Sequence, residues 1–464
     1  MRRFELVLAF GCAFAVLWPA IFGVRSRRGI IAVTLLGLIA LQLRAEGYRW
    51  QLLPLYLTAT GLAVGDVIFI ERRLVWYRRA ARGVFGSIGV ALVALPGLAL
   101  PVPSLPTPSG PEVIGSITVE VISLEREESY GPNPGGPRRI VAQVWYPAVD
   151  DSEVEFDLWH PAVEEMAPAL SRRLGLPGFF LNHLRYVPSH SKAGLPIRAG
   201  RFPIVVYSHG WTGFRTIALN QIEALVSNGY MVIAIDHTYG SLLTVDSEGA
   251  SVPYDPLALP DPATVTAQQY AASASALVEV FSDDQIAVLD ALEMGADGPF
   301  AAVFEHTDTT RIGIYGHSVG GGAAVRTCLL DDRCDAVVGM DPWVEPLADR
   351  VIAITAAKPM LFMRSDDWRG NTNDAILRGL AARGEATNYL VGIDGAGHND
   401  LVATPLLTPL ADDFGLRGSI GAGRVLLIVE RHLVGFFDHT LLGTGAAAIQ
   451  TSSFSEVVVE VIEP

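Results

Sequence analysis

The first 102 residues contain four apolar stretches, which restrict the possible structures of this chain more than any other feature. The stretches cover roughly residues 5–24, 29–43, 52–70 and 84–102, and each is bordered by arginines or a break. About 20 apolar residues are enough to cross the hydrocarbon layer of a membrane as a helix. The sequence therefore predicts about four transmembrane helices, although the second stretch is short and the fourth contains Pro96. No small-x-small cleavage site follows the first stretch, so we expect an uncleaved anchor rather than a signal peptide.

Charged residues divide the chain in the same way and predict its orientation. Residues 1–102 hold twelve arginines, no lysine and four acidic residues, a formal +8, which leaves −23 for residues 103–464 out of −15 overall. Arginines gather after the first and third stretches, at Arg25, Arg27 and Arg28 and at Arg72, Arg73, Arg78, Arg79 and Arg82. The positive-inside rule makes both loops cytoplasmic, so we expect a multi-pass protein of the cell membrane whose large acidic part is extracytoplasmic. This acidic charge argues against a nucleic-acid partner.

A proline-rich linker, PVPSLPTPSGP at residues 101–111, separates the apolar region from a soluble part because it cannot continue a helix. In the soluble part, strand-like segments alternate with helix-like segments, for example FPIVVYSHG with TIALNQIEALVSNG. This alternation predicts an α/β fold with a mostly parallel sheet and helices on both faces. We place the transmembrane region at 1–102, the linker at 103–115, the α/β domain at 116–442 and a C-terminal tail or terminal strand at 443–464.

The segment RIGIYGHSVGGGAAV, residues 311–325, has the pattern of a nucleophile elbow. An elbow needs a strand that ends at the serine, a glycine on each side of the strained turn, and a helix that starts immediately afterwards. RIGIY supplies the strand, Gly316 and Gly320 flank Ser318, and GGAAVRTCLL supplies the helix. The bare G-x-S-x-G pattern is weak in a chain with 46 glycines, but this context predicts that Ser318 is a nucleophile.

A serine nucleophile needs a base and an acid, which in this type of fold follow it in the order serine, acid, histidine. Of the three histidines after Ser318, His398 lies in the loop sequence IDGAGHND after a predicted strand, whereas the other two lie on the last predicted helix. We therefore predict that His398 is the base. Asp341 ends one predicted strand and Asp366 and Asp367 follow the next, so the spacing leaves the choice of acid open.

The oxyanion of the reaction intermediate needs two backbone N–H donors. One is expected from Val319, the residue after the nucleophile, and the other from the loop after an earlier strand. The segment SHGWTGFRT occupies that earlier position, and Gly210 and Gly213 permit a tight loop there. We predict Trp211 as the second donor and expect its indole to form a wall of the acyl pocket.

Four segments in this order, VVYSHGWTGFRT, GHSVGG, GMDPWVEPL and DGAGHND, resemble the plasma-type platelet-activating factor acetylhydrolase family, also known as lipoprotein-associated phospholipases A2. The resemblance runs from about residue 141 to the last predicted helix. It implies an α/β-hydrolase fold, a triad of Ser318, Asp341 and His398, and oxyanion donors at Trp211 and Val319, and it thereby favours Asp341 as the acid. The implied activity is hydrolysis of short or truncated acyl esters, such as those of phospholipids, although related bacterial members include polyester and dienelactone hydrolases.

Two regions depart from the family pattern. The apolar N-terminal region is not part of the family's catalytic domain, and residues 156–193 contain no motif of the family. The second region includes LGLPGFFLNHL, in which Phe179, Phe180 and Leu181 would form a lid or a lipid-facing edge over the site, or else belong to the core.

The sequence contains no H-E-x-x-H, no cysteine-histidine cluster and no Walker-type lysine, so we expect neither a metal nor an organic cofactor. Cys328 and Cys334 are expected either to form a local disulfide or to remain two buried thiols. Three other functions stay open: an acyltransferase on the same triad, a catalytically silent membrane sensor or scaffold, and a transporter that uses Asp66 within an apolar stretch. The oligomeric state is left open.

Overall fold

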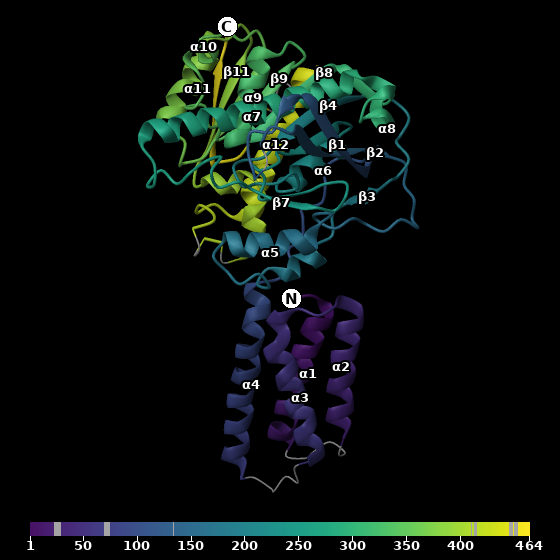
Figure 1. Cartoon of the computed structure of the whole chain (residues 1–464). Helices are drawn as coiled ribbons and strands as arrows, with labels where there is room; N and C mark the ends of the chain where they lie inside the picture. The colour runs from purple at the N-terminus through teal and green to yellow at the C-terminus, as the bar shows by residue number, and fades with distance from the viewer. Residues whose placement is uncertain are drawn as a thin grey trace.

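An N-terminal helical bundle stands under a large α/β domain in the computed structural model of the protein (Figure 1). The structure describes residues 1–22, 29–68, 75–132, 134–409, 411–412, 415–444, 449 and 453–464. The bundle consists of α1 (Arg3–Phe22), α2 (Ile30–Glu46), α3 (Leu53–Ile68) with the 3-10 turn η1 (Trp50–Leu52) before it, and α4 (Trp76–Ala99). Within the described residues, three helical segments are long and apolar enough to cross a membrane, namely α1, Trp50–Ile68 and α4, whereas α2 has only 17 residues.

A buried ion pair marks the end of the bundle that faces the domain. Arg49, between α2 and α3, lies 2.6 Å from Glu5 near the start of α1. The same guanidinium donates hydrogen bonds to the carbonyls of Gly97 and Leu100, where α4 ends. The start of α1 and the end of α4 therefore lie at the same end of the bundle, as Figure 1 also shows.

Three of the five arginines that we placed in the third loop lie in a helix instead. Arg78, Arg79 and Arg82 lie in the first turns of α4, because arginine is a good helix former and its long side chain can reach past the helix end. Arg79 donates to the carbonyl of Ala20, so these turns adjoin the last residues of α1. The other arginines of the two predicted loops, Arg25, Arg27, Arg28, Arg72 and Arg73, lie outside the described residues.

Asp66, considered above as an intramembrane carboxylate, lies at one end of the bundle. Its Oδ2 accepts hydrogen bonds from the backbone N–H groups of Gly29, at 2.9 Å, and Ala32, at 3.4 Å. A carboxylate at this position satisfies N–H groups that have no partner inside a helix. The geometry therefore gives Asp66 a structural role at the start of α2.

One ten-stranded sheet runs through the described part of the α/β domain in the order β12-β11-β10-β9-β8-β4-β5-β2-β1-β3. The six strands from β11 to β5 in this order are parallel, whereas β2 is antiparallel to both of its neighbours and β12 is antiparallel to β11. The bounds are β1 (Val113–Glu127), β2 (Pro137–Ala148), β3 (Ser191–Ala193), β4 (Phe202–Ser208), β5 (Met231–Asp236), β8 (Thr307–His317), β9 (Ala336–Met340), β10 (Met360–Arg364), β11 (Asn388–Ile393) and β12 (Val457–Ile462). A separate two-stranded sheet pairs β6 (Leu243–Val245) with β7 (Ser251–Pro253).

Helices cover both faces of the sheet, and each face has its own hydrophobic core. One core contains residues of α6 (Leu219–Ser227) and α12 (Ala422–Leu442). The other contains residues of α7 (Ala267–Glu293), α9 (Val319–Leu330) and α11 (Thr372–Arg383). The prediction of a mostly parallel sheet between helices is confirmed. Shorter helices are α5 (Val163–Arg173), α8 (Ala301–Phe304), α10 (Asp349–Ile352), η2 (Asn182–Tyr186), η3 (Gly295–Asp297), η4 (His398–Leu401) and η5 (Thr404–Leu406).

The C-terminal segment is a strand of the main sheet and not a tail. β12 pairs along its whole length with β11, from Asn388 opposite Ile462 to Ile393 opposite Val457. Its valines and isoleucine suit an extended, half-buried edge position, and pairing satisfies backbone groups that β11 would otherwise expose. The α/β domain therefore extends beyond residue 442, where we placed its boundary.

The segment predicted as a lid or lipid-facing edge forms part of the contact between the domain and the bundle. The indole of Trp50 donates to the carbonyl of Phe180 at 2.9 Å and packs edge-on against Phe179. The hydroxyl of Tyr186 donates to the carbonyl of Tyr48 at 2.7 Å. Leu181 is buried in the domain core, so the alternative expectation of a core position applies to this residue.

Cys328 and Cys334 are joined by a disulfide at the end of α9, which is one of the two alternatives left open by the sequence. Their Cα atoms are 5.1 Å apart, within the usual range for a disulfide. Cys12, in α1, is a free and buried thiol.

Candidate active site

Ser318 stands at a sharp turn between β8 and α9, as an elbow requires. Its φ is 55° and its ψ is −120°, a conformation that most residues avoid. Strain of this kind costs on the order of 1–3 kcal/mol and persists where the surrounding structure enforces it. The enforcement comes from close packing, because a Cβ on Gly320 would lie 2.3 Å from the carbonyl oxygen of Ser208. A Cβ on Gly316 would lie 2.4 Å from the backbone of Gly320.

We expect Gly320→Ala to destabilise the protein by about 1–3 kcal/mol, because the new methyl group meets backbone atoms that cannot move aside. Gly423→Ala is the matched control. Gly423 lies in α12 with no atom within 4 Å of its ideal Cβ, so alanine should raise the free energy of unfolding there by about 0.5–1 kcal/mol. Thermal unfolding of both variants measures the difference, and equal stability of the two would contradict the steric argument.

A hydrogen-bonded pair of His398 and Asp341 lies close to the elbow. Nδ1 of His398 is 3.0 Å from Oδ2 of Asp341, and the carboxylate is fully buried at the end of β9. Burial raises the pKa of Asp341, while the hydrogen bonds from His398 and Ser365 act in the opposite direction. Because the carboxylate accepts a hydrogen bond, Nδ1 of His398 carries the proton. Nε2 is then the ring nitrogen that can take up another proton.

Three neighbours of this pair carried no signal in the sequence. The backbone N–H of Ser365 donates to Oδ1 of Asp341 at 2.8 Å, and its hydroxyl donates to Oδ2. The indole of Trp368 stacks on the imidazole of His398 with a centroid distance of 4.6 Å and an interplanar angle of 9°. Nε2 of His317 donates to the carbonyl of His398 at 2.9 Å, and burial lowers the pKa of His317 well below its usual value. Trp368 thus packs on the imidazole of His398, whereas Ser365 holds the carboxylate of Asp341 and His317 holds the backbone of His398.

The two alternative acids lie elsewhere around His398. Oδ2 of Asp367 accepts from the backbone N–H of His398 at 2.7 Å, and not from the ring. Asp366 pairs with Arg369 and accepts from the backbone N–H of Gly395. Of the three candidates, only Asp341 is hydrogen-bonded to the imidazole of His398 in the described structure.

The loop that follows β4, which contains Gly210 and Trp211, approaches Ser318. Gly210 approaches Ser318 so closely that a Cβ on Gly210 would lie 3.0 Å from Cβ of Ser318. Val319 is the first residue of α9, where backbone N–H groups have no partner inside the helix. Val319 therefore adjoins Ser318 in the chain, and Trp211 follows the glycine that approaches Ser318.

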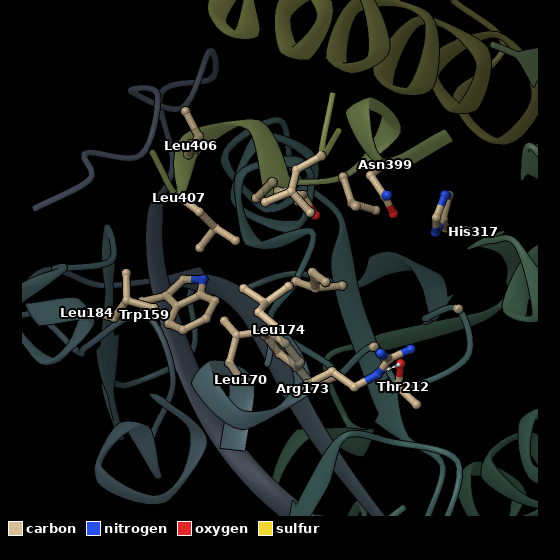
Figure 2. A pocket seen from close by; sticks show the side chains of 18 of the residues that line it. Trp159, Leu170, Arg173, Leu174, Leu184, Thr212, His317, Asn399, Leu406 and Leu407 are labelled. Carbon is tan, nitrogen blue, oxygen red and sulfur yellow. Dashed lines mark hydrogen bonds between the residues drawn. The ribbon is translucent and has the colours of Figure 1, made fainter. Parts of the chain in front are cut away.

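An apolar cavity of about 390 Å³ opens at the elbow (Figure 2). Ser318, His398 and Trp211 line one part of it. Figure 2 shows Leu174 and Leu184 on one side, Leu406 and Leu407 on another, and His317 at the far end. Pro103 and Leu105 of the linker complete the wall, so the linker packs against the domain and does not act as a free spacer.

A metal site is not apparent at this cavity. In the ranges that the structure describes, no group of three or more histidine, cysteine, aspartate or glutamate side chains is arranged to hold a metal ion.

Comparison with known proteins identifies the family. The sequence model described as "Platelet-activating factor acetylhydrolase, isoform II" matches residues 131–246 and 284–444, which is more than half of the chain. The chain belongs to the platelet-activating factor acetylhydrolase family. The platelet-activating factor acetylhydrolase of Gallus gallus is 21% identical over 336 residues, covering 64% of this chain and 77% of that protein. The corresponding protein of Cavia porcellus is 23% identical over 319 residues, covering 64% and 72%.

A solved structure supports the same fold. The ferulic acid esterase from Streptomyces cinnamoneus superposes with a TM-score of 0.62 at 23% identity, over 77% of this chain and 99% of that chain. Two sequence predictions are thereby confirmed, the resemblance to the platelet-activating factor acetylhydrolase family and the α/β-hydrolase fold behind N-terminal apolar helices. As a member of this family the protein is a carboxylic ester hydrolase, as predicted.

Proposed function

We propose that the protein is a membrane-anchored serine hydrolase that cleaves acyl esters of lipids through Ser318, His398 and Asp341. One observation carries the proposal: a strained serine and a hydrogen-bonded histidine-aspartate pair meet at the same apolar cavity. Each of these features is unfavourable or unusual in isolation, and together they form the arrangement that serine nucleophiles require.

In the proposed mechanism, Ser318 attacks the ester carbonyl while Nε2 of His398 accepts the hydroxyl proton. The N–H groups of Trp211 and Val319 stabilise the oxyanion that forms, and Asp341 stabilises the charged imidazolium through Nδ1. The imidazolium then gives its proton to the leaving alcohol, which leaves an acyl-enzyme. Water, deprotonated by His398, attacks the acyl-enzyme and releases the acid.

The cavity supports a lipid ester as the substrate. An aliphatic chain can lie along its leucine-lined part while the ester reaches Ser318, since apolar contact is favourable for such a chain. Arg173 lines the same cavity and donates to the hydroxyl of Thr212, so it supplies a cation that suits a lipid phosphate. The names of the two vertebrate relatives agree with this substrate class.

Membrane anchoring is supported by the lengths and ends of the helices. α4 has 24 residues, which at about 1.5 Å per residue is more than enough to cross a bilayer core of about 30 Å. Trp76 and Tyr77 stand at one end of the bundle and Tyr48 and Trp50 at the other, the positions that aromatic residues favour at membrane interfaces. With the arginine-rich ends in the cytoplasm, the domain is extracytoplasmic.

A protease added to intact cells should then digest the domain, and full protection would refute this orientation.

We predict that Leu407→Asn raises KM for p-nitrophenyl octanoate about tenfold and leaves KM for the acetate within twofold, because a polar group replaces apolar contact with the chain. Leu257→Asn is the matched control, since Leu257 is 78% exposed and does not line the cavity. Both are assayed in the full-length protein in detergent micelles. Equal losses on both esters would reject a chain-binding role for this wall.

The same assay tests the reaction itself. Product analysis with a competing alcohol separates hydrolysis, which releases free acid, from acyl transfer, which yields a new ester. A folded protein that turns over none of the esters would overturn the proposed function and favour a silent sensor or scaffold.

A further inference from the structure

A buried polar cluster that the mechanism does not use lies directly behind the oxyanion loop. Its members Ser208, His209, His237, Ser241 and Asp284 are all fully buried. Nε2 of His237 is 2.6 Å from the hydroxyl of Ser208, and Nδ1 is 3.0 Å from the carboxylate of Asp284. These contacts repeat the connectivity of a serine-histidine-aspartate triad. Complete burial keeps this second serine from any substrate, so the role of the cluster concerns the loops that it joins.

The hydrogen bonds of His209 fix the position of its proton. Nδ1 is 2.7 Å from the carbonyl oxygen of Gly210, and a carbonyl can only accept, so Nδ1 carries the proton. Nε2 faces the backbone N–H of His237 at 3.4 Å, which can only donate, and the hydroxyl of Ser241 at 2.7 Å. The imidazole is therefore neutral, with one defined tautomer. Burial lowers the pKa of His209 well below its usual value, and the neighbouring His237 acts in the same direction.

The partner of His209 belongs to the peptide group that holds the proposed oxyanion donor. The Gly210 carbonyl accepts from Nδ1 of His209 and from the backbone N–H of Gly213, at 2.8 Å. The described peptide bonds are all trans, so the N–H of Trp211 points away from that carbonyl. Two donors on the oxygen thereby fix the direction of the N–H on the opposite side of the same plane.

We infer that His209 is a positioning residue, which orients the Gly210–Trp211 peptide so that the Trp211 N–H is aimed at the oxyanion before the substrate arrives. Preorganised donors of this kind need no rearrangement during the reaction, which is the source of their catalytic effect. The inference rests on the proposed roles of Ser318 and Trp211.

The rest of the cluster keeps His209 in place. The loop after β5 contains both groups that contact Nε2 of His209. In the same loop, the carbonyl of Gly240 accepts a hydrogen bond from the backbone N–H of Thr212 at 3.0 Å. His237, within this loop, is held by Asp284. The charge of Asp284 is balanced by ion pairs with Arg138, at 2.7 Å, and with Arg126, at 2.8 Å. A balanced carboxylate holds the His237 ring without requiring it to be protonated.

The test compares His209→Leu, which removes the donor to Gly210, with His209→Asn, whose amide nitrogen can replace Nδ1. On p-nitrophenyl butyrate we expect His209→Leu to lower kcat about 100-fold with KM within twofold, because the lost interaction acts on the transition state. His209→Asn should recover kcat to within about tenfold of the wild type. An aryl trifluoromethyl ketone, which forms an oxyanion with a serine nucleophile, should lose affinity for His209→Leu by the same factor as kcat.

Ser208→Ala is the matched control, since it removes a buried hydroxyl next to His209 that makes no bond to Gly210. Asp284 still holds His237 after this change, so activity should stay within about threefold. If Ser208→Ala loses as much activity as His209→Leu, or if His209→Asn restores nothing, the positioning role is refuted. If His209→Leu does not fold, His209→Asn and Ser241→Ala decide. Ser241→Ala removes the hydroxyl that contacts Nε2 and leaves the weaker contact from the backbone N–H of His237, so it should lower kcat without changing KM. Full activity of His209→Leu alongside an inactive Ser318→Ala would reject this inference alone, whereas an inactive wild type would reject the proposed function.

Discussion

Ser318→Ala is expected to reduce kcat/KM for p-nitrophenyl butyrate by about four to six orders of magnitude, the range seen when a triad nucleophile is removed. Without the hydroxyl, no acyl-enzyme can form, and only binding and the oxyanion donors remain to assist the attack of water. The fold should tolerate the change, because the strained backbone of the elbow is held by Gly316 and Gly320 and not by the side chain of Ser318. Steady-state kinetics of the full-length protein in detergent measure the effect.

A covalent label provides the control for this result. A fluorophosphonate should add its phosphonyl group once to the wild type, at Ser318, and not to Ser318→Ala. The buried Ser208 should stay unlabelled in both proteins, although it also contacts a histidine, because it is 0% exposed. Residual activity within tenfold of the wild type in Ser318→Ala would remove this serine from the mechanism.

Asp341→Asn is expected to reduce kcat by about 10⁴-fold with little change in KM. The amide can donate to Nδ1 of His398, and this favours the tautomer whose proton sits on Nε2, the nitrogen that has to act as the base. The amide also cannot stabilise the imidazolium that forms during the attack. Kinetics on the same ester measure the loss, and thermal unfolding shows whether the variant is folded.

Asp367→Asn is the matched control for the acid. Its carboxylate accepts from the backbone N–H of His398 and not from the ring, so neutralising it should lower kcat less than tenfold. Asp366→Asn should behave similarly, since Asp366 pairs with Arg369. A larger loss from either of these variants than from Asp341→Asn would assign the acid to the loop that follows β10.

The parts of the site that sequence alone could predict are those set by neighbours in the chain. The elbow depends on a strand, two flanking glycines and a small-residue helix within residues 311–325, so its pattern is complete in the sequence. The apolar helices are equally local, because hydropathy over about 20 residues predicts a span without knowledge of any contact. The alternation of strands and helices likewise predicted the layered fold that the structure has.

Contacts between distant segments were beyond such reasoning. Asp341 and His398 are 57 residues apart, and spacing alone could not choose among three carboxylates until the resemblance to a family favoured one of them. Ser365 and Trp368 hold this pair, yet an isolated serine or tryptophan after a strand carries no signal for such a role. The same holds for His209, whose sequence neighbours indicated the oxyanion loop but not the hydrogen bond that orients it.

The sequence by itself determined the local conformations of this protein: the elbow at Ser318, the apolar helices and the alternating strands and helices. The tertiary structure alone decided which side chain holds His398, that β12 closes one edge of the sheet, and that the segment around Phe180 rests on Trp50, 130 residues away. The physical reason is the range of the interactions. Backbone conformation and hydropathy act over a few residues, whereas hydrogen bonds between side chains depend on where the whole fold brings distant segments together.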